Sequence, residues 1–223
     1  MADLAAGSFR PADILSRCGN RSGHDIAALL PGGDARLSFL PERMKRPMNT
    51  SKAETPRAII VMGVSGCGKS SVARLIAERA GFEQVEGDDL HPASNVDKMT
   101  AGIPLEDADR WPWLDRVGAE LARERQTGVV VTCSALKKIY RDRLRATAGQ
   151  PLAFVFLNGS ETLLAERIGA RAGHFMPTSL LKSQLETLED PSGEPGVVTV
   201  DIDKPLNVIA DDAIAGLSAV SFR

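Results

Sequence analysis

Residues 58–70 read AIIVMGVSGCGKS. The first five residues form a short apolar run, which is typical of a buried parallel strand. The next eight, Gly63–Ser70, satisfy the pattern G-x-x-x-x-G-K-[ST] of a phosphate-binding loop, or P-loop. In such a loop the backbone N–H groups surround a polyphosphate, the lysine (here Lys69) reaches the β- and γ-phosphates, and the hydroxyl (here Ser70) binds Mg²⁺. The stretch therefore predicts a nucleoside triphosphate site between a strand and a helix.

Cys67 lies inside this loop, where a nucleophile or a redox switch is one interpretation. A helix N-terminus would favour its thiolate. We favour the simpler interpretation that a variable loop position holds a small side chain.

Apolar runs and helical spacings alternate outward from the loop. A helix is expected to follow the loop, because apolar residues recur at helical spacing over residues 72–80. Further strands are expected at 84–86, 129–133, 154–157 and 197–200, with helices at 113–125, 137–146, 160–170 and 208–217. This alternation predicts the α/β class: a P-loop NTPase fold with a doubly wound parallel β-sheet flanked by helices.

The composition restricts the class of protein further. The chain has 223 residues, 43% of them hydrophobic, and a formal net charge of −2, which gives no support to a role on nucleic acid or on a membrane surface. Its three cysteines, Cys18, Cys67 and Cys133, have no metal-like spacing. They exclude a disulfide scaffold and fit a reducing compartment, so we expect a cytoplasmic protein.

The N-terminal segment differs from the rest of the chain. Residues 1–57 carry nine basic and six acidic side chains, a balance of +3, and frequent Pro and Gly without a sustained period. Neither a secretory signal nor a mitochondrial transit peptide fits this pattern. We expect residues 1–56 to be a disordered or loosely ordered extension and residues 57–223 to be the domain that carries the P-loop. Translation from Met44 or Met48 is an open alternative.

Polar side chains follow two of the expected strands, where ligands bind in open α/β sheets. Asp88 and Asp89 follow the strand at 84–86, and either could orient or deprotonate an acceptor hydroxyl, although capping the next helix is an alternative. Lys137 and Arg141 follow the strand at 129–133, either as a solvated helix face or as cations for a small acidic acceptor.

Arg167 and Arg171 lie four residues apart on one expected helical face, beside two glycines. This arrangement suits a small helical lid whose arginines close over a transferring phosphate. The residues alone thus indicate a kinase of a small polar acceptor. A nucleotide-binding regulatory protein without turnover is a remote alternative.

Several strings, in this order, carry a more specific resemblance. They include Leu90-His91-Pro92, Ser134-Ala135-Leu136-Lys137-Lys138 and Gly173-His174-Phe175, and the match covers about residues 57–217. With the P-loop, they resemble the thermoresistant P-loop gluconokinases, which are related to shikimate and adenylate kinases. The resemblance implies phosphorylation of D-gluconate at its C6 hydroxyl by ATP with Mg²⁺, giving 6-phospho-D-gluconate and ADP. It also implies a homodimer. A kinase of another small sugar acid or of shikimate is the nearest alternative.

The resemblance also implies roles for individual residues. Lys69, Asp88, Arg167 and Arg171 would be catalytic, with Asp88 serving the acceptor hydroxyl and Ser70 the metal. The nucleotide would be bound by Gly63, Ser65, Gly66, Cys67, Gly68, Lys69, Ser70, Ser71, Lys204 and Pro205. The sugar acid would be bound by Asp88, His91, Lys98, Arg110, Lys137, Arg141, His174 and Gln184.

The sequence departs from the family pattern at several positions. Residues 1–56 have no counterpart in it. Cys67 replaces a small residue, often serine, and Met176-Pro177 follows the Gly-His-Phe string. Asp89 stands where an apolar residue is common, so the choice between Asp88 and Asp89 as the working acid stays open.

Overall fold

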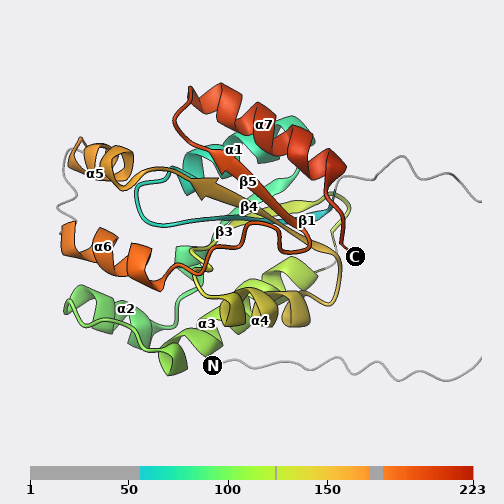
Figure 1. The fold of residues 1–223 in the computed structure, drawn as a ribbon. Helices are drawn as coiled ribbons and strands as arrows, with labels where there is room; N and C mark the ends of the chain where they lie inside the picture. Colours follow the sequence, from blue (N-terminus) through green and yellow to red (C-terminus); the bar gives the residue numbers. More distant parts are fainter. Residues whose placement is uncertain (1–55, 124, 171–177, 223) are drawn as a thin grey trace, which may run out of the picture. The chain divides into compact units, whose positions relative to one another are not determined.

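The computed structural model describes residues 56–123, 125–170 and 178–222. These residues contain a five-stranded, entirely parallel sheet in the order β2-β3-β1-β4-β5 (Figure 1). The strands are β1 (Ala58–Met62), β2 (Glu83–Glu86), β3 (Val129–Thr132), β4 (Leu152–Asn158) and β5 (Val197–Asp201). The helices are α1 (Lys69–Ala80), α2 (Ala93–Thr100), α3 (Asp107–Ala122), α4 (Lys138–Ala148), α5 (Glu161–Gly169), α6 (Thr178–Thr187) and α7 (Leu206–Ala219), with a 3₁₀ helix, η2, at Gly87–Leu90.

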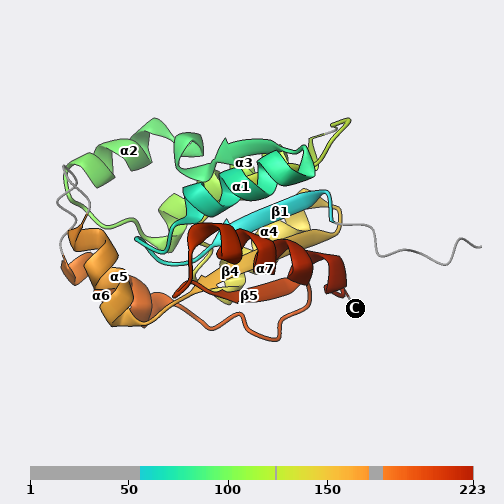
Figure 2. The same ribbon diagram turned by 90° about the horizontal axis from the view of Figure 1, so that it is seen from above.

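The central strand β1 explains the layering, because its alternate side chains face opposite sides of the sheet. Ile59 and Val61 belong to one buried cluster, which includes residues of α1 and α7. Ile60 and Met62 belong to a second cluster, formed with α3 and α4. All five residues of β1 are fully buried, as a central parallel strand requires. The expected doubly wound parallel sheet is therefore confirmed, with helices on both faces (Figures 1 and 2).

The expected strands and helices are present, with shifted ends. Helix α3 begins at Asp107, six residues before the expected start, because Glu106 and Asp109 form a capping box there and Pro112 is accommodated inside the helix. Lys137 is the N-cap of α4 and not its first residue. The sequence analysis missed η2, α2 and α6.

The parallel strands all end at the same edge of the sheet. The P-loop after β1, η2 after β2 and the loop after β3 therefore meet at this edge, and α2, α5 and α6 lie toward it in both views (Figures 1 and 2). The residues 1–55, Arg171, His174 and the Met176-Pro177 pair lie outside the described residues. Within the described part of the chain, no helix has the length and apolar character needed to cross a membrane.

Candidate active site

Two glycines of the P-loop are required by the packing around them. Gly63 has a φ of +139°, and a Cβ there would lie 2.9 Å from Cys67 Sγ and 3.0 Å from the Leu157 carbonyl oxygen. A Cβ at Gly66, where φ is +84°, would lie 2.6 Å from a side-chain carbon of Ile168 on α5. The loop is thus held closely between β4 and α5, and a larger side chain at either position would displace it.

The P-loop presents positive charge and the uncapped start of α1 to its ligand. Lys69 Nζ donates to the carbonyl oxygens of Gly63 and Val64, at 3.1 Å each, so the ammonium group is held over the loop. Helix α1 starts directly after Gly68, and no side chain caps it. Its first N–H groups are therefore available to an anion such as a phosphate.

Glu86, at the end of β2, adds a carboxylate that the sequence analysis missed. Its Oε2 accepts from the Ser70 hydroxyl at 3.1 Å and from the Thr132 hydroxyl at 2.7 Å. Hydroxyl and carboxylate oxygens are the ligands that Mg²⁺ prefers, so these side chains fit the metal that the family resemblance implies. The pairing of Glu86 with Thr132 across β2 and β3 could not be read from the sequence.

Asp88 lies in η2, and its charge acts on the buried groups around it. The pKa of Cys133 is raised to about 12, mainly by burial; a hydrogen bond with the Ala135 backbone lowers it, the charge of Asp88 raises it and that of Lys69 lowers it. Asp88 and Lys69 thus both lie within electrostatic range of the same thiol. Asp88 also opposes the lowering of the His91 pKa by burial. The sequence analysis could not choose between Asp88 and Asp89. The carboxylate whose charge acts on Cys133 and His91 is that of Asp88.

His91 is held in one tautomer. Its ring stacks on that of Trp113, with centroids 4.3 Å apart, and Trp113 Nε1 donates to the Gly87 carbonyl oxygen at 2.7 Å. The buried Asn95 amide, through Nδ2, donates to the Asp109 carbonyl oxygen at 2.8 Å and lies 3.2 Å from His91 Nδ1. Since Nδ2 is a donor, Nδ1 must be the acceptor, and the proton of the neutral ring is on Nε2.

Lys137 and Arg110 lie beside the ring of Tyr140, at 5.5 and 5.8 Å from its centroid. Asp107 accepts from the Tyr140 hydroxyl and from Lys137 Nζ, the latter at 2.9 Å. These two hydrogen bonds, with Tyr140 the larger influence, lower the pKa of Asp107. The pKa of Lys137 is raised by the same contact, so both groups are charged at neutral pH.

A second ion pair lies next to the first. Lys98 on α2 pairs with Asp109 of α3 at 2.6 Å, and the hydrogen bond from Lys98 lowers the pKa of Asp109. Three of the predicted sugar-acid ligands, Lys98, Arg110 and Lys137, are therefore grouped around the N-terminus of α3 with two carboxylates. We call these five side chains the acceptor cluster.

The structure corrects the prediction for Arg141, which is fully buried. Its guanidinium donates to the carboxylate of Glu194 and to the carbonyl oxygens of Ala135, Leu136 and Glu189. These contacts use all five N–H donors of the side chain. Arg141 therefore joins α4 to the segment before β5, and it is not available to bind a sugar acid.

Other predicted residues also have contacts that the sequence did not indicate. Arg167 Nη2 donates to the Ile202 carbonyl oxygen at 2.7 Å, beside the loop that carries Lys204 and Pro205. Gln184 on α6 accepts a hydrogen bond from the backbone of the P-loop. Burial raises the pKa of the Cys67 thiol, so this thiol is not the activated thiolate that a helix N-terminus alone would favour.

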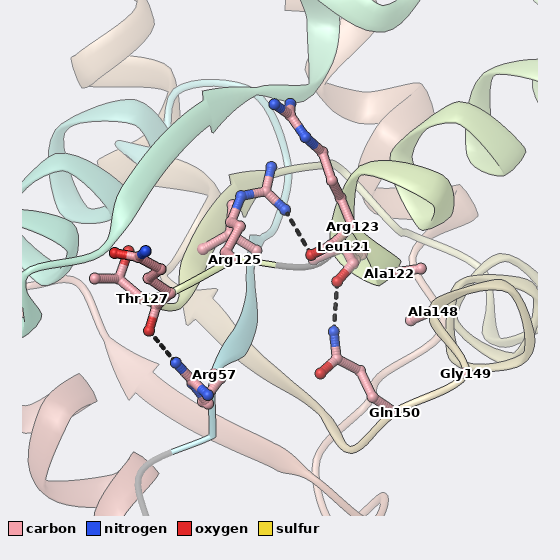
Figure 3. A pocket seen from close by; sticks show the side chains of 11 residues that line it. Arg57, Leu121, Ala122, Arg123, Arg125, Thr127, Ala148, Gly149 and Gln150 are labelled. Carbon is pink, nitrogen blue, oxygen red and sulfur yellow. Dashed lines mark hydrogen bonds between the residues drawn. The ribbon is translucent and has the colours of Figure 1, made fainter. Parts of the chain in front are cut away.

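A cavity of about 610 Å³ lies elsewhere, where β1, β3 and β4 begin (Figure 3). Arg57 and Arg125 line it, but Arg57 donates to the Gln126 carbonyl oxygen and Arg125 pairs with Glu83 and Glu120. This cavity lies at the edge of the sheet opposite the P-loop, where the strands begin. The candidate active site is therefore the P-loop edge.

Comparisons with known proteins agree with this geometry. The AAA domain family matches residues 59–191. A gluconokinase of Gluconobacter oxydans is 46% identical over 166 residues, covering 74% of this chain and 93% of that protein. The thermoresistant gluconokinase of Escherichia coli is 45% identical over 159 residues, covering 70% and 90%.

A solved structure extends the likeness to three dimensions. The crystal structure of a gluconokinase from Sinorhizobium meliloti is 58% identical, has a TM-score of 0.69, and covers 74% of this chain and 93% of its own. Sequence identity at this level over nearly the full length of the relatives, together with the P-loop and its parallel sheet, assigns the family. The chain belongs to the gluconokinase family.

Proposed function

We propose that the protein transfers the γ-phosphoryl group of ATP to the C6 hydroxyl of D-gluconate. Asp88 accepts the proton of that hydroxyl while its oxygen forms a bond to the γ-phosphorus. The bond from the γ-phosphorus to the bridging oxygen of ADP breaks, and the products are 6-phospho-D-gluconate and ADP. Asp88 is proposed for this role because its charge and that of Lys69, the lysine proposed to bind the phosphates, both act on Cys133.

The charge of the acceptor cluster is the observation that carries the proposal. Its three cations lie close together, and a group of cations can bind the carboxylate of a sugar acid. The aspartates can also accept hydrogen bonds from sugar hydroxyls. His91, whose Nδ1 contacts the Asn95 amide that also bonds to Asp109, adds a donor at Nε2. A polyhydroxy acid fits this set of groups.

The donor side is proposed to act through positioning and charge. Lys69 and the N–H groups at the start of α1 bind the phosphates. Ser70 and Glu86 would hold Mg²⁺. When bound, this ion would neutralise charge on the phosphate oxygens. Arg167 is proposed as a lid arginine; its Nη2 donates to the Ile202 carbonyl oxygen, and its charge acts on Cys67 of the P-loop.

A coupled assay of ADP release from Mg-ATP tests the proposal, with gluconate, shikimate, other sugar acids and neutral sugars as acceptors. We expect strong turnover with gluconate alone. Turnover with a different acid would support kinase activity but would show that the acceptor is not gluconate. ATP binding without turnover would contradict the proposed function. We also propose a cytoplasmic homodimer, which size-exclusion chromatography with light scattering can test for its oligomeric state.

A further inference from the structure

Gln184 makes a contact that its proposed place among the sugar-acid ligands does not explain. Its side-chain Oε1 accepts a hydrogen bond from the backbone N–H of Ser65 at 2.7 Å. The two residues are 119 positions apart in the chain, and the contact is partly buried. A long-range side chain thus satisfies a backbone donor at the turn of the P-loop.

The same peptide group is held from its other side. The Val64 carbonyl belongs to the peptide unit that contains the Ser65 N–H, and it accepts from Lys69 Nζ at 3.1 Å. A trans peptide is planar, so its carbonyl and its N–H point in opposite directions and turn together. Fixing the N–H with Gln184 therefore also fixes the carbonyl that seats the Lys69 ammonium.

Helix α6 holds the Gln184 amide firmly. Leu181, one turn earlier, is 3% exposed and packs in the same buried cluster as Val64. Directly after α6, the Glu189 N–H donates to the Leu136 carbonyl oxygen at 3.0 Å, and the Glu189 carboxylate accepts from the Lys138 N–H at 2.5 Å. The helix is thus attached to the core and to the loop after β3, and it can act as a rigid support.

We propose that Gln184 is a positioning residue of the P-loop, which orients the Val64–Ser65 peptide so that Lys69 is directed at the phosphates of ATP. This inference rests on the proposed function, and it moves Gln184 from the sugar acid to the nucleotide. Removing the amide should weaken Mg-ATP binding by about 3- to 10-fold, the range for one net hydrogen bond. The KM for gluconate should stay within about twofold, since the contacts of the acceptor cluster are unchanged.

The test combines isothermal titration calorimetry of Mg-ATP without gluconate with steady-state measurement of the KM for gluconate, on the wild type and three variants. Gln184→Met removes the amide at nearly constant volume. Gln184→Asn keeps the amide but is one methylene shorter, so it should lose the contact with Ser65 as well. Lys182→Met, at an exposed position of the same helix, is the matched control and should bind Mg-ATP as the wild type does. Circular dichroism verifies that each variant is folded.

Weaker Mg-ATP binding by both Gln184 variants, with an unchanged KM for gluconate, would support the proposal. A raised KM for gluconate with unchanged Mg-ATP binding would overturn it and return Gln184 to the sugar acid. No change in either quantity would overturn it too. If the wild type fails to phosphorylate gluconate, the proposed function fails, but the comparison of Mg-ATP affinities still decides the role of Gln184.

Discussion

The donor side and the acceptor side of the site meet at one edge of the sheet, yet they are assembled differently. The donor side is mainly one stretch, Gly63–Ser70, whose lysine bonds to carbonyls five and six residues away. The acceptor cluster joins Lys98 of α2, the first turn of α3 and Lys137, which lies 30 residues beyond its partner Asp107. The residues of the donor side are therefore mostly neighbours in the sequence, whereas the residues of the acceptor cluster come together only when separate elements pack in the folded chain.

This difference indicates how the two sides should respond to substitution. A substitution on the donor side should impair ATP binding or phosphoryl transfer to the same degree with every acceptor. A change in the acceptor cluster should alter recognition of the acid and leave ATP binding intact. The substitutions below test this separation.

The largest effect is expected for Asp88→Asn, which removes the proposed base at the junction of the two sides. The kcat should fall by about 10²- to 10⁴-fold, the usual contribution of a general base, while the Kd for Mg-ATP stays unchanged. Steady-state kinetics and titration measure the two quantities. Asp89→Asn is the matched control at the exposed neighbouring position. An equal loss in that variant would reassign the base.

Lys69→Ala tests the donor side alone. The loss of a charge directed at the transferring phosphate should lower kcat/KM by about 10²- to 10³-fold with every acceptor. The fold should persist, because Lys69 bonds only to the carbonyls of its own loop among the described residues. The coupled assay and thermal melting measure these effects. Retention of most of the activity would rule out the P-loop as the ATP site.

The sequence was sufficient for features that depend on neighbouring residues. The P-loop motif and the apolar runs of β1, β3 and β4 predicted the phosphate site and the parallel sheet. The sequence was insufficient where the position of a side chain depends on a partner that is distant in the chain. Arg141 and Lys137 are one helical turn apart and look alike in the sequence. The Arg141 guanidinium is nevertheless buried, because it pairs with Glu194, which is 53 residues away in the chain. Glu86 was missed for the same reason, because its hydroxyl partners lie on other elements.

Arg141→Met and Lys137→Met compare these two cations directly. Arg141→Met leaves Glu194 largely buried without its main partner and should lower the free energy of unfolding by about 3–5 kcal/mol. Its KM for gluconate should be unchanged at temperatures where the variant is folded. Lys137→Met should do the reverse, raising the KM with a small effect on stability. Urea unfolding and steady-state kinetics separate the outcomes, and a raised KM in folded Arg141→Met would restore it as a ligand.

The smallest effect concerns pH. Burial lowers the pKa of His91 from its ordinary value of 6.5, so the unfolded chain takes up this proton at a higher pH than the folded chain does. The contribution of His91 to stability is therefore greatest above pH 6.5 and decreases as the pH falls below that value. Urea unfolding at pH 7.5 and pH 5.5 should show a smaller loss for His91→Gln than for the wild type. An equal loss would mean that His91 titrates normally in the folded protein.

The most direct test of the account compares two acceptors with the same C6 hydroxyl. D-Glucitol has a hydroxyl where gluconate has its carboxylate, so it tests whether the acceptor cluster reads the acid. We expect kcat/KM for glucitol to be about a hundredfold lower than for gluconate in the wild type, as the loss of a charged hydrogen bond would give. In Lys137→Met we expect a smaller difference between the kcat/KM values for gluconate and glucitol. Equal kcat/KM values for the two acceptors in the wild type would contradict recognition of a sugar acid by this cluster.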